Sequence, residues 1–288
     1  MKQLLFLAHR IPYPPNKGDK IRSFHLLNEL RKEYKIHLAT FVDDKEDLQY
    51  QEHVASLCES MCVVQIDPFT CKLKSLKGLI TSQALSIPYY ESKQISKYVE
   101  DVIAKGVDKV LVFSSAMAQF VISNRFDLKM VVDFVDIDSD KWRQYSQSKR
   151  WPASAIYNRE YKKLFDWEHR VADRADHSLF VSEKESAMFR QLVPSVAEKV
   201  HSIDNGVDYN YFAYNSELGN PYSDESPKVV FTGAMDYWAN VDAVKWFAEE
   251  VLPLVQQSVA NIQFYIVGSK PTSKVMALKN ISGVTVTG

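Results

Sequence analysis

The sequence contains little glycine, and this shortage excludes several classes of enzyme. Glycine makes up 9 of the 288 residues. Neither the G-x-G-x-x-G pattern of dinucleotide-binding proteins nor the G-x-x-x-x-G-K-[ST] pattern of P-loop nucleotidases occurs. The H-E-x-x-H pattern of zinc proteases and the G-x-S-x-G pattern of serine hydrolases are absent as well. The chain therefore belongs to none of the classes that these patterns mark.

Cysteine is also scarce, being present only as Cys58, Cys62 and Cys71. An odd and sparse set argues against a disulfide scaffold and is typical of a reducing compartment, so we expect a cytoplasmic protein. Cys58 and Cys62 lie four residues apart, but only His53 lies close to them as a further ligand, and zinc sites use about four ligands. We therefore expect buried thiols, no metal site and no cofactor.

Long apolar runs and a strong charge of one sign are missing too. No run approaches the roughly 18–20 residues of a membrane-spanning helix, and Leu4–Ala8 is too short for the core of a signal peptide. The net charge is −1, which excludes an overall basic nucleic-acid-binding protein. Hydrophobic residues make up 46% and charged residues 25% of the chain, as in ordinary globular proteins with a core.

Short apolar runs alternate with helix-period segments over residues 1–207. The predicted strands are Leu4–Ala8, Ile36–Val42, Cys62–Ile66, Val110–Phe113, Met130–Val135, Ser178–Val181 and Lys199–Ile203. The predicted helices are Lys20–Glu33, Lys45–Glu59, Ser92–Lys105, Ala116–Arg125, Ile156–Ala175 and Glu183–Leu192. Strands separated by helices indicate βαβ units and a mostly parallel sheet, so we expect an α/β, doubly wound domain.

Residues 208–227 lack periodicity and are rich in Asn, Gly, Ser and Pro, which predicts a linker. Alternation resumes in a second domain at 228–288. Its predicted strands are Lys228–Thr232, Gln263–Val267 and Val284–Val286, and its predicted helices are Asn240–Gln257 and Thr272–Lys279. Three strands are half of a doubly wound domain and would leave an edge uncovered. We expect the second domain to be incomplete here; the alternative is a small three-stranded appendage.

The segment Val229–Ala243 joins a β-branched strand to a helix that is predicted to begin at Asn240, through a loop that begins at Gly233. Open α/β sheets bind ligands, often phosphates, at such strand–loop–helix units. We therefore expect this segment to open the second domain and to contribute to its binding site.

Four segments resemble one known family: residues 6–27 (FLAHRIPYPPNKGDKIRSFHLL), residues 132–142 (VDFVDIDSDKW), residues 205–208 (NGVD), and Val229–Ala243. They are similar to the retaining, glycogen-synthase-like group of GT-B glycosyltransferases. Within that group they look most like a bacterial sugar-transferase subgroup associated with exopolysaccharide loci. The resemblance extends over essentially the whole chain.

The resemblance implies two Rossmann-like domains, with a nucleotide-diphosphate sugar held mainly by the second and an acceptor held mainly by the first. It also implies transfer with retention of configuration and no required metal. Related enzymes carry two donor-binding glutamates near the fifth helix of the second domain, which this sequence does not reach. We therefore expect residues 1–288 by themselves to transfer little or no sugar.

The loop after the first strand carries candidate binding residues, namely Asn16, Lys17, Gly18, Lys20 and Arg22. Negative charge builds on the diphosphate as the sugar leaves, and cationic side chains, helix N-termini and backbone N–H groups stabilise such charge. Glycine also lets the backbone approach a ligand. The five residues are predicted to bind donor or acceptor; the alternative is a solvated loop that caps the helix.

Asp133 and Asp136 end the fifth strand and are the predicted catalytic residues. In enzymes of the similar family a histidine commonly occupies the position aligned with Asp136, near the donor sugar. A carboxylate there can orient a sugar hydroxyl or assist removal of the acceptor's proton. The alternative is helix capping. His9, at the end of the first strand, is predicted either to bind substrate or to be a satisfied structural histidine.

Strand ends in the second domain supply the remaining candidates. Gly233 and Gly268 are predicted to approach the donor, and Trp238 either to stack on its base or sugar or to pack against protein. Gly206 is predicted to adopt a positive φ at the domain junction, with a hinge role favoured over ligand contact. Related enzymes often place an Arg and a Lys in the loop where this chain has Met235–Trp238, so the charge partner of the diphosphate remains unassigned.

Residues 141–170 combine basic and aromatic side chains. They contain eight Lys or Arg against three Asp or Glu, a surplus of five in a protein of net charge −1. Three of the five tryptophans lie here: Trp142, Trp151 and Trp167. Such a segment suits an anionic bilayer surface. The segment therefore predicts either a peripheral membrane contact or, as the favoured alternative, an amphipathic helix whose aromatic side chains belong to the core.

The predicted function is transfer of a sugar from a nucleotide-diphosphate donor to a saccharide or lipid-linked acceptor in polysaccharide biosynthesis, at the cytoplasmic face of the membrane. The partners are then a nucleotide-sugar and an acceptor, and no nucleic acid. One alternative is a nucleotide-sugar 2-epimerase, which has a similar two-domain cleft and no acceptor. The other is a non-catalytic binding protein with a degenerate donor site.

Overall fold

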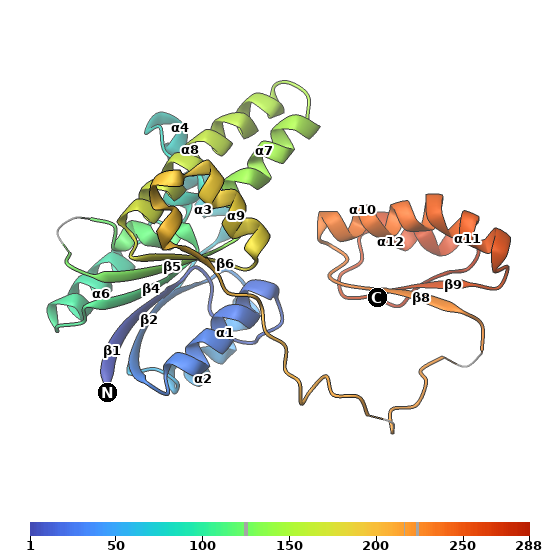
Figure 1. Ribbon diagram of the computed structural model, residues 1–288, viewed down its shortest axis with the longest axis horizontal. Helices are drawn as coiled ribbons and strands as arrows, with labels where there is room; N and C mark the ends of the chain where they lie inside the picture. Colours follow the sequence, from blue (N-terminus) through green and yellow to red (C-terminus); the bar gives the residue numbers. More distant parts are fainter. Residues whose placement is uncertain (124–125, 216, 223–224) are drawn as a thin grey trace. The chain divides into compact units, whose positions relative to one another are not determined.

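The computed structural model describes residues 1–123, 126–215, 217–222 and 225–288 (Figure 1). The chain forms two compact units, Met1–Asp208 and Tyr209–Gly288. Each unit contains its own parallel sheet.

The first unit is built on a seven-stranded sheet with the strand order β3-β2-β1-β4-β5-β6-β7. Every neighbouring pair is parallel. The strands are β1 (Lys2–Ala8), β2 (Tyr34–Val42), β3 (Ser60–Gln65), β4 (Lys109–Phe113), β5 (Lys129–Val135), β6 (His177–Phe180) and β7 (Val200–Ser202). The winding direction reverses between β1 and β4, which is the position where doubly wound sheets open a crevice for ligands.

Alternate residues of β1 face two separate cores, because successive side chains of a strand point to opposite faces. Leu4 and Phe6 pack in one core with residues of α1 (Gly18–Leu30) and α2 (Gln51–Ala55). Leu5 and Leu7 pack in the other core with α6 (Lys93–Ala104), α8 (Ala153–Arg174) and α9 (Glu183–Leu192). Helices on both faces explain why the buried part of β1 reads as a continuous apolar run rather than an alternating one.

The strand predictions agree with the structure to within two residues at each end. The helix predictions agree less well. Lys45–Glu59 divides into a 3-10 helix, Lys45–Tyr50, and α2, and Ala116–Arg125 contains a 3-10 helix, Ser115–Phe120; the positions 124–125 lie outside the described residues. The helices α3 (Pro68–Ser75), α4 (Lys77–Ile80) and α5 (Ser86–Tyr89) had no predicted counterpart. The helix expected after Asp138 is α7 (Asp138–Ser148).

The second unit contains the parallel sheet β10-β9-β8, and its strands β8 (Lys228–Thr232), β9 (Gln263–Val267) and β10 (Val284–Val286) have the predicted bounds. The first helix starts at Trp238, two residues before the predicted Asn240. It runs through α10 (Trp238–Trp246), a π-helical turn and α11 (Leu252–Ser258). Pro253 lacks the N–H that would bond to a carbonyl of the preceding turn, which accounts for the wider π turn there. A short helix, α12 (Ser273–Ala277), precedes β10.

Gly268 allows the β9 loop to pass directly over Gly233, the residue after β8. A Cβ atom built on Gly268 would lie 1.7 Å from the carbonyl oxygen of Gly233, and Gly268 has a φ of +157°. Gly233 donates its N–H to Val267 (3.0 Å), which fixes the two loops together. The two glycines therefore approach each other, and their predicted approach to the donor stays a prediction.

The substitution Gly268→Ala is expected to destabilise the second unit by more than about 2 kcal/mol, because the backbone of Gly233 cannot move away without breaking its bond to β9. Limited proteolysis and thermal unfolding measure this loss. Gly219→Ala is the matched control, since a Cβ there meets nothing within 4 Å. Equal midpoints for the two variants would show that the close contact carries no energetic weight.

Candidate functional site

A polar hollow of about 200 Å³ lies at the carboxyl ends of β1, β4 and β5. It is therefore next to the reversal point of the sheet, where the topology places a ligand site. Side chains and backbone from the three strand ends, from the start of α1 and from the start of α7 line it: His9, Asp19, Ser114, Phe134, Val135, Asp136, Asp138 and Lys141. The sequence analysis had named two of these, His9 and Asp136.

The backbone around this hollow is strained at two adjacent strand ends. Ser114 has a φ of +75° and Val135 a φ of +69°, and a β-branched residue is rarely found in that region. Each such residue costs about 1–3 kcal/mol and persists only where its surroundings hold it. Asp133 supplies that hold, since its carbonyl accepts the Ser114 N–H (2.9 Å) and its Oδ1 accepts the Val135 N–H (3.1 Å). The resulting turn brings Asp136 to the rim of the hollow.

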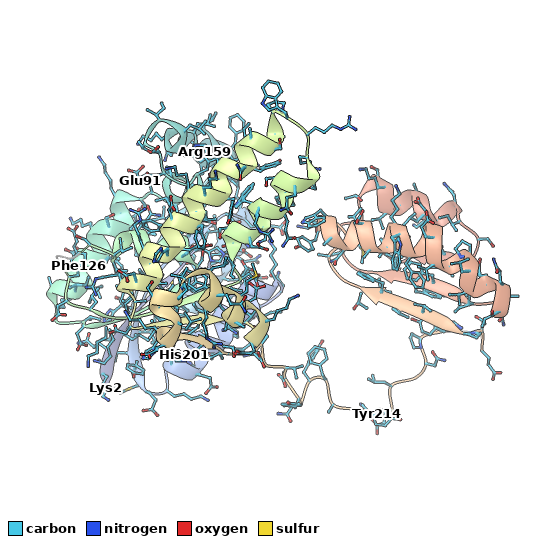
Figure 2. The ribbon with its side chains drawn as sticks, turned by 45° about the horizontal axis from the view of Figure 1, so that its top comes forward. Lys2, Glu91, Phe126, Arg159, His201 and Tyr214 are labelled. Atoms are coloured by element: carbon cyan, nitrogen blue, oxygen red, sulfur yellow. The ribbon has the colours of Figure 1, made fainter. Side chains whose placement is uncertain are left out.

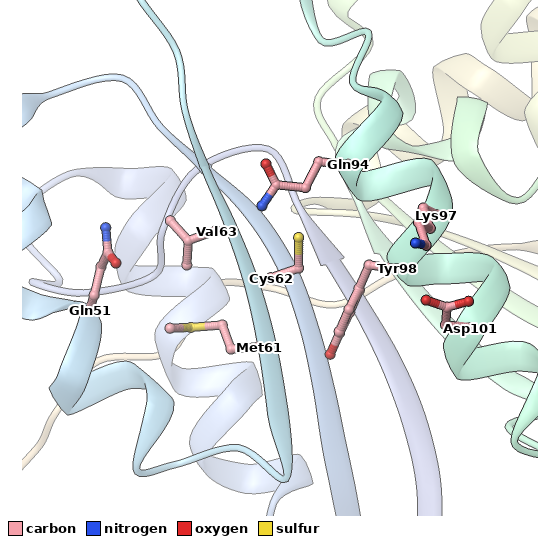
Figure 3. A pocket seen from close by; sticks show the side chains of 8 residues that line it. All are labelled: Gln51, Met61, Cys62, Val63, Gln94, Lys97, Tyr98 and Asp101. Carbon is pink, nitrogen blue, oxygen red and sulfur yellow. The ribbon is translucent and has the colours of Figure 1, made fainter.

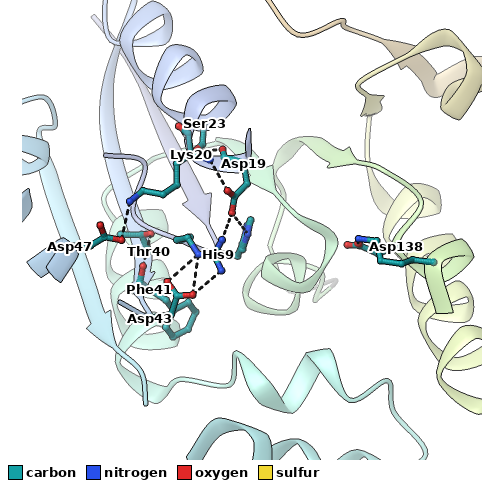
Figure 4. Close-up of polar contacts among 11 residues, drawn as sticks. His9, Asp19, Lys20, Ser23, Thr40, Phe41, Asp43, Asp47 and Asp138 are labelled. Carbon is teal, nitrogen blue, oxygen red and sulfur yellow. Dashed lines mark hydrogen bonds and ion pairs between the residues drawn. The ribbon is translucent and has the colours of Figure 1, made fainter. Parts of the chain in front are cut away.

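A charged network connects His9 to the loops after β1 and β2 (Figure 4). Arg10 binds both carboxylate oxygens of Asp43 through Nε and NH2, at 2.7–3.1 Å. Its NH1 lies 2.5 Å from Oδ2 of Asp19, and the same oxygen lies 3.3 Å from Nε2 of His9. His9 also stacks on Phe113 with parallel rings 5.8 Å apart. These contacts fix the imidazole at the edge of the hollow.

The acidic members of the network remain ionised at neutral pH. Although burial opposes the charged form, the hydrogen bond from His9 and the charge of Arg10 hold the pKa of Asp19 well below its usual range. Burial is likewise outweighed at Asp43, where the Arg10 guanidinium lowers the pKa. The loops after β1 and β2 are therefore held together by permanent charge. Arg10, Asp19 and Asp43 were not predicted as site residues. Arg10 and Asp43 lie within two residues of a strand end, and Asp19 lies in the first turn of α1.

Two of the predicted ligand-binding cations are buried in ion pairs instead. Nζ of Lys20 lies 2.9 Å from Asp47, with both side chains almost fully buried. Nε of Arg22 lies 2.8 Å from Asp133, and its NH1 donates to the carbonyl of Ile203 and to Asn205. Because these charges are committed to internal partners, we assign Lys20 and Arg22 positioning roles and do not carry them forward as ligand contacts.

The two predicted catalytic aspartates differ in their exposure to solvent. Asp133 is fully buried against Arg22, so it acts on the site through the backbone that it holds. Asp136 is exposed at the hollow, together with Asp138 and Lys141. Loss of solvent around its carboxyl group raises the pKa of Asp136 above its ordinary value, although the charge of Lys141 opposes this and that of Asp138 adds to it. Asp136 is therefore the carboxylate that can touch a substrate, and a raised pKa suits proton transfer.

Asn16, Lys17 and Gly18 form the exposed entrance to α1. Lys17 is the extended residue that precedes the helix, and its own side chain makes no capping hydrogen bond. A Cβ built on Gly18 meets nothing within 4 Å. Nothing in the local packing calls for glycine here, so the open space is available to a ligand that approaches the backbone.

Glu168 of α8 lies in the protein interior and forms hydrogen bonds with the first turn of α7. The sequence did not predict this role. Its carboxyl group accepts the Ser139 N–H (3.1 Å) and lies 2.5 Å from the Ser139 hydroxyl. Burial raises the pKa of Glu168 to about 8. In the native state Glu168 therefore keeps its proton up to about pH 8, whereas in the unfolded chain it loses the proton near its ordinary pKa of 4.5.

Native stability is accordingly expected to fall as pH rises from about 5 to 8, and Glu168→Gln is expected to remove about 2–4 kcal/mol of that loss. Glutamine copies the neutral acid, which can both accept the Ser139 N–H and donate a hydrogen bond. Urea unfolding of both proteins at several pH values gives the difference directly, since every other titrating group is shared. A difference that does not change with pH would contradict a neutral Glu168.

In the second unit the predicted site residues separate into core and surface. Met235, which stands in the loop where related enzymes place cations, is fully buried in the core. Trp238 and its neighbour Tyr237 are about half exposed at the start of α10. Gly206 has no positive φ, and a Cβ there would meet nothing, so the predicted left-handed turn is wrong. Its hinge role remains a prediction.

A second hollow, of about 490 Å³, lies beside the edge strand β3 and is lined by α6 and Gln51 (Figure 3). It includes the thiol of Cys62, and burial raises the pKa of that thiol. A protonated thiol is a poor nucleophile, so we assign this hollow no chemistry. Within the described ranges, no three His, Cys, Asp or Glu side chains are placed to hold a metal ion.

The aromatic residues of the basic segment 141–170 are mostly half-buried. Trp167 is buried and donates its indole N–H to the carbonyl of Ser115 (3.0 Å). Trp142 packs on Tyr145 and Tyr157 between α7 and α8. Trp151, at the α7–α8 turn, is 82% exposed. No helix among the residues that the structure describes is long and apolar enough to cross a bilayer.

Comparison with known protein families finds one match, in the second unit. Residues 226–288 match the family model described as "Glycosyl transferases group 1". This segment begins two residues before β8 and contains all three strands of the sheet. No curated protein matches the sequence.

Solved structures resemble the whole chain. Sucrose-phosphate synthase from Thermosynechococcus elongatus is similar with a TM-score of 0.66 at 16% identity, over 100% of this chain and 70% of that one. The N-terminal domain of trehalose-6-phosphate phosphatase from Candida albicans has a TM-score of 0.60 at 14% identity, over 99% and 72%. UDP-forming trehalose-phosphate synthase from Burkholderia xenovorans has a TM-score of 0.52 at 10% identity, over 98% and 67%.

At these identities the structural likeness shows the fold, which is GT-B. The predicted fold class is thereby confirmed. The match to a glycosyltransferase family in residues 226–288, together with this fold, supports a glycosyltransferase.

Proposed function

We propose that the protein transfers a sugar from a nucleotide-diphosphate donor to a saccharide or lipid-linked acceptor, with retention of configuration, in polysaccharide biosynthesis. The observation that carries this proposal is the strained, charged hollow at the reversal point of the first sheet, in a chain whose residues 226–288 match a glycosyltransferase family. The name of the Burkholderia neighbour, UDP-forming, makes UDP the first nucleotide to test.

In this proposal the first unit supplies acceptor contacts around the hollow. The bond between the sugar's anomeric carbon and the diphosphate oxygen breaks, the acceptor oxygen bonds to the same face of that carbon, and the acceptor's proton is lost. Asp136 orients or helps deprotonate the acceptor hydroxyl, and Lys141 stands beside it in the same hollow. His9, fixed by Asp19 and Phe113, presents a preset polar edge.

The second unit supplies donor contacts in this proposal. Trp238 and Tyr237 are exposed aromatic rings at the start of a helix that follows a strand, where a base or sugar ring can stack. The first unit adds Lys17 and the open backbone at Gly18, which offer charge and N–H groups to the leaving diphosphate. We also place the protein at the cytoplasmic face of a membrane, with residues 141–170 facing anionic lipid. Its two domains are residues 1–207 and 228–288, and residues 208–227 form the linker between them.

Calorimetry with UDP, GDP and ADP tests the donor, and a transfer assay with sugar-labelled donors tests the reaction. We expect one nucleotide to bind at micromolar concentration and label to move onto an acceptor in a glycosidic bond. Conversion of a UDP-sugar to its epimer without any acceptor would favour the 2-epimerase. Nucleotide binding with no turnover by any donor would favour the non-catalytic alternative.

A further inference from the structure

Two short helices on the first unit expose a stripe of large apolar side chains. These are Phe69, Leu73, Leu76, Leu79 and Ile80 of the segment α3–α4, which we call the α3–α4 stripe. Ile80 is 91% and Phe69 71% exposed. Isolated apolar side chains are common on surfaces, but five in twelve consecutive residues are not, and such patches mark docking sites.

The periodicity of the segment explains why the stripe faces outward. Phe69, Leu73, Leu76 and Ile80 are four, three and four residues apart, the spacing of one face of a helix. Leu76 joins the two helices with right-handed helical angles. Cys71 and Gly78 are buried, and they lie on the opposite side of the segment. The segment therefore packs on the protein through small residues and presents its large apolar residues to the outside.

Lysines border the stripe. Lys72 and Lys77 lie on either side of it by helical position, and both are exposed. Lys77 forms an exposed ion pair with Glu91 at 3.4 Å, which is weak in water and can exchange for a lipid headgroup. Lys74 and Lys77 also line a groove of about 660 Å³ that reaches Phe41 of β2 and Lys93 at the start of α6. The groove lies beside Cys71, on the side of the segment opposite the stripe, and extends to the sheet's carboxyl edge. The candidate acceptor hollow lies at the same edge.

The stripe is attached to the basic helix α8. Arg159 donates from NH2 to the carbonyls of Gly78 (2.6 Å) and Gln83 (3.2 Å). Figure 1 shows α4 beside α8, and Figure 2 labels Arg159 there. The exposed Trp151 lies at the α7–α8 turn, next to the exposed Lys149 and Arg150. Apolar and cationic side chains are thus combined on both parts of this region.

We propose that the α3–α4 stripe, with Lys72 and Lys77 at its margins, docks the protein on an anionic lipid bilayer. The apolar side chains enter the interface between headgroups and acyl chains, and the lysines meet anionic headgroups. The charge argues for this occupant, because lysines around an apolar stripe match an anionic lipid surface better than an uncharged partner. The inference rests on the proposed function, since it brings the groove to a lipid-linked acceptor.

Vesicle flotation of the purified protein tests the proposal, with phosphatidylglycerol–phosphatidylcholine vesicles compared with phosphatidylcholine alone. We expect binding that requires phosphatidylglycerol and weakens with salt. The double variant Leu73→Ser, Ile80→Ser is expected to bind at least about tenfold more weakly. The double variant Lys72→Gln, Lys77→Gln is expected to lose about tenfold and to lose the lipid preference.

The matched control is Trp246→Ser, Leu254→Ser, which removes two exposed apolar side chains from the second unit and is expected to bind vesicles normally. Circular dichroism verifies that each variant folds. Unchanged vesicle binding by the Leu73, Ile80 variant would overturn the proposal. The proposal would also be overturned if the parent protein formed dimers and bound no vesicles, and if the Leu73, Ile80 variant lost those dimers in analytical ultracentrifugation. A second copy of the chain would then cover the stripe.

The two proposals fail separately in this design. Nucleotide binding by calorimetry involves no vesicles, so a protein that binds nucleotide and ignores phosphatidylglycerol would contradict the docking surface alone. A protein that binds vesicles through the stripe and transfers no sugar from any donor would contradict the glycosyltransferase alone.

Discussion

Asp136→Asn is expected to lower the turnover number for sugar transfer by about 10²–10⁴-fold, the usual contribution of a positioned acid–base group. The amide keeps the size of the side chain and loses its ability to take a proton. The pH profile should change as well, because the limb set by the raised pKa of Asp136 disappears. Steady-state kinetics over a range of pH gives both effects.

Asp166→Asn is the matched control, since it makes the same change at an exposed position on α8. It is expected to leave the turnover number and the pH profile unchanged. If Asp136→Asn retained full activity with an unaltered pH profile, Asp136 would be a surface residue without a part in the chemistry. Binding of the donor nucleotide should survive the substitution, because the defect is in the reaction step.

Arg22→Met is expected to destabilise the first unit by about 3–5 kcal/mol, because it leaves the fully buried Asp133 without its cationic partner. The loss extends beyond the ion pair. Asp133 also holds the strained Val135 and the turn that presents Asp136, and Arg22 ties α1 to Ile203 and Asn205. Denaturant unfolding measures the free energy, and transfer activity should fall together with it.

A second variant separates the ion pair from the rest. The double substitution Arg22→Met, Asp133→Asn is expected to recover part of the stability, since the buried charge is then removed while the amide oxygen can still accept the Val135 N–H. Lys32→Met is the matched control, because its pair with Glu29 is exposed and contributes about 0–1 kcal/mol. Equal losses for Arg22→Met and Lys32→Met would contradict the account of the buried pair.

The sheets were predictable from sequence because buried parallel strands appear as short, continuous apolar runs such as Leu4–Ala8. The helices α3 and α4 were not, because their apolar residues face outward and alternate with lysines. Helix prediction from amphipathic periodicity takes the apolar face of a helix to be buried, and it therefore misses a helix whose apolar face is exposed. The same five residues nevertheless follow a helical spacing, which is the signal that could have revealed them.

The candidate site was predictable in position and only partly in its residues. Strand ends at the reversal point gave His9 and Asp136, which do meet in one hollow. Lys20 and Arg22 looked like free cations because their partners are remote in sequence: Asp47 lies 27 and Asp133 lies 111 residues away. The same long-range pairing decides that Asp133 is buried and that Asp136 is not. No local pattern contains that information.

Transfer of a labelled sugar is the most direct test of the central proposal. The protein, together with any residues that its gene encodes after Gly288, is incubated with UDP-, GDP- and ADP-sugars labelled in the sugar. Extracted saccharide and lipid acceptors are present or left out, and the products are separated and analysed by NMR. We predict that label appears on an acceptor in a glycosidic bond with the donor's anomeric configuration, together with an equal amount of free nucleoside diphosphate. Label that stays on the nucleotide with every donor and acceptor, or that changes only to an epimer, would contradict it.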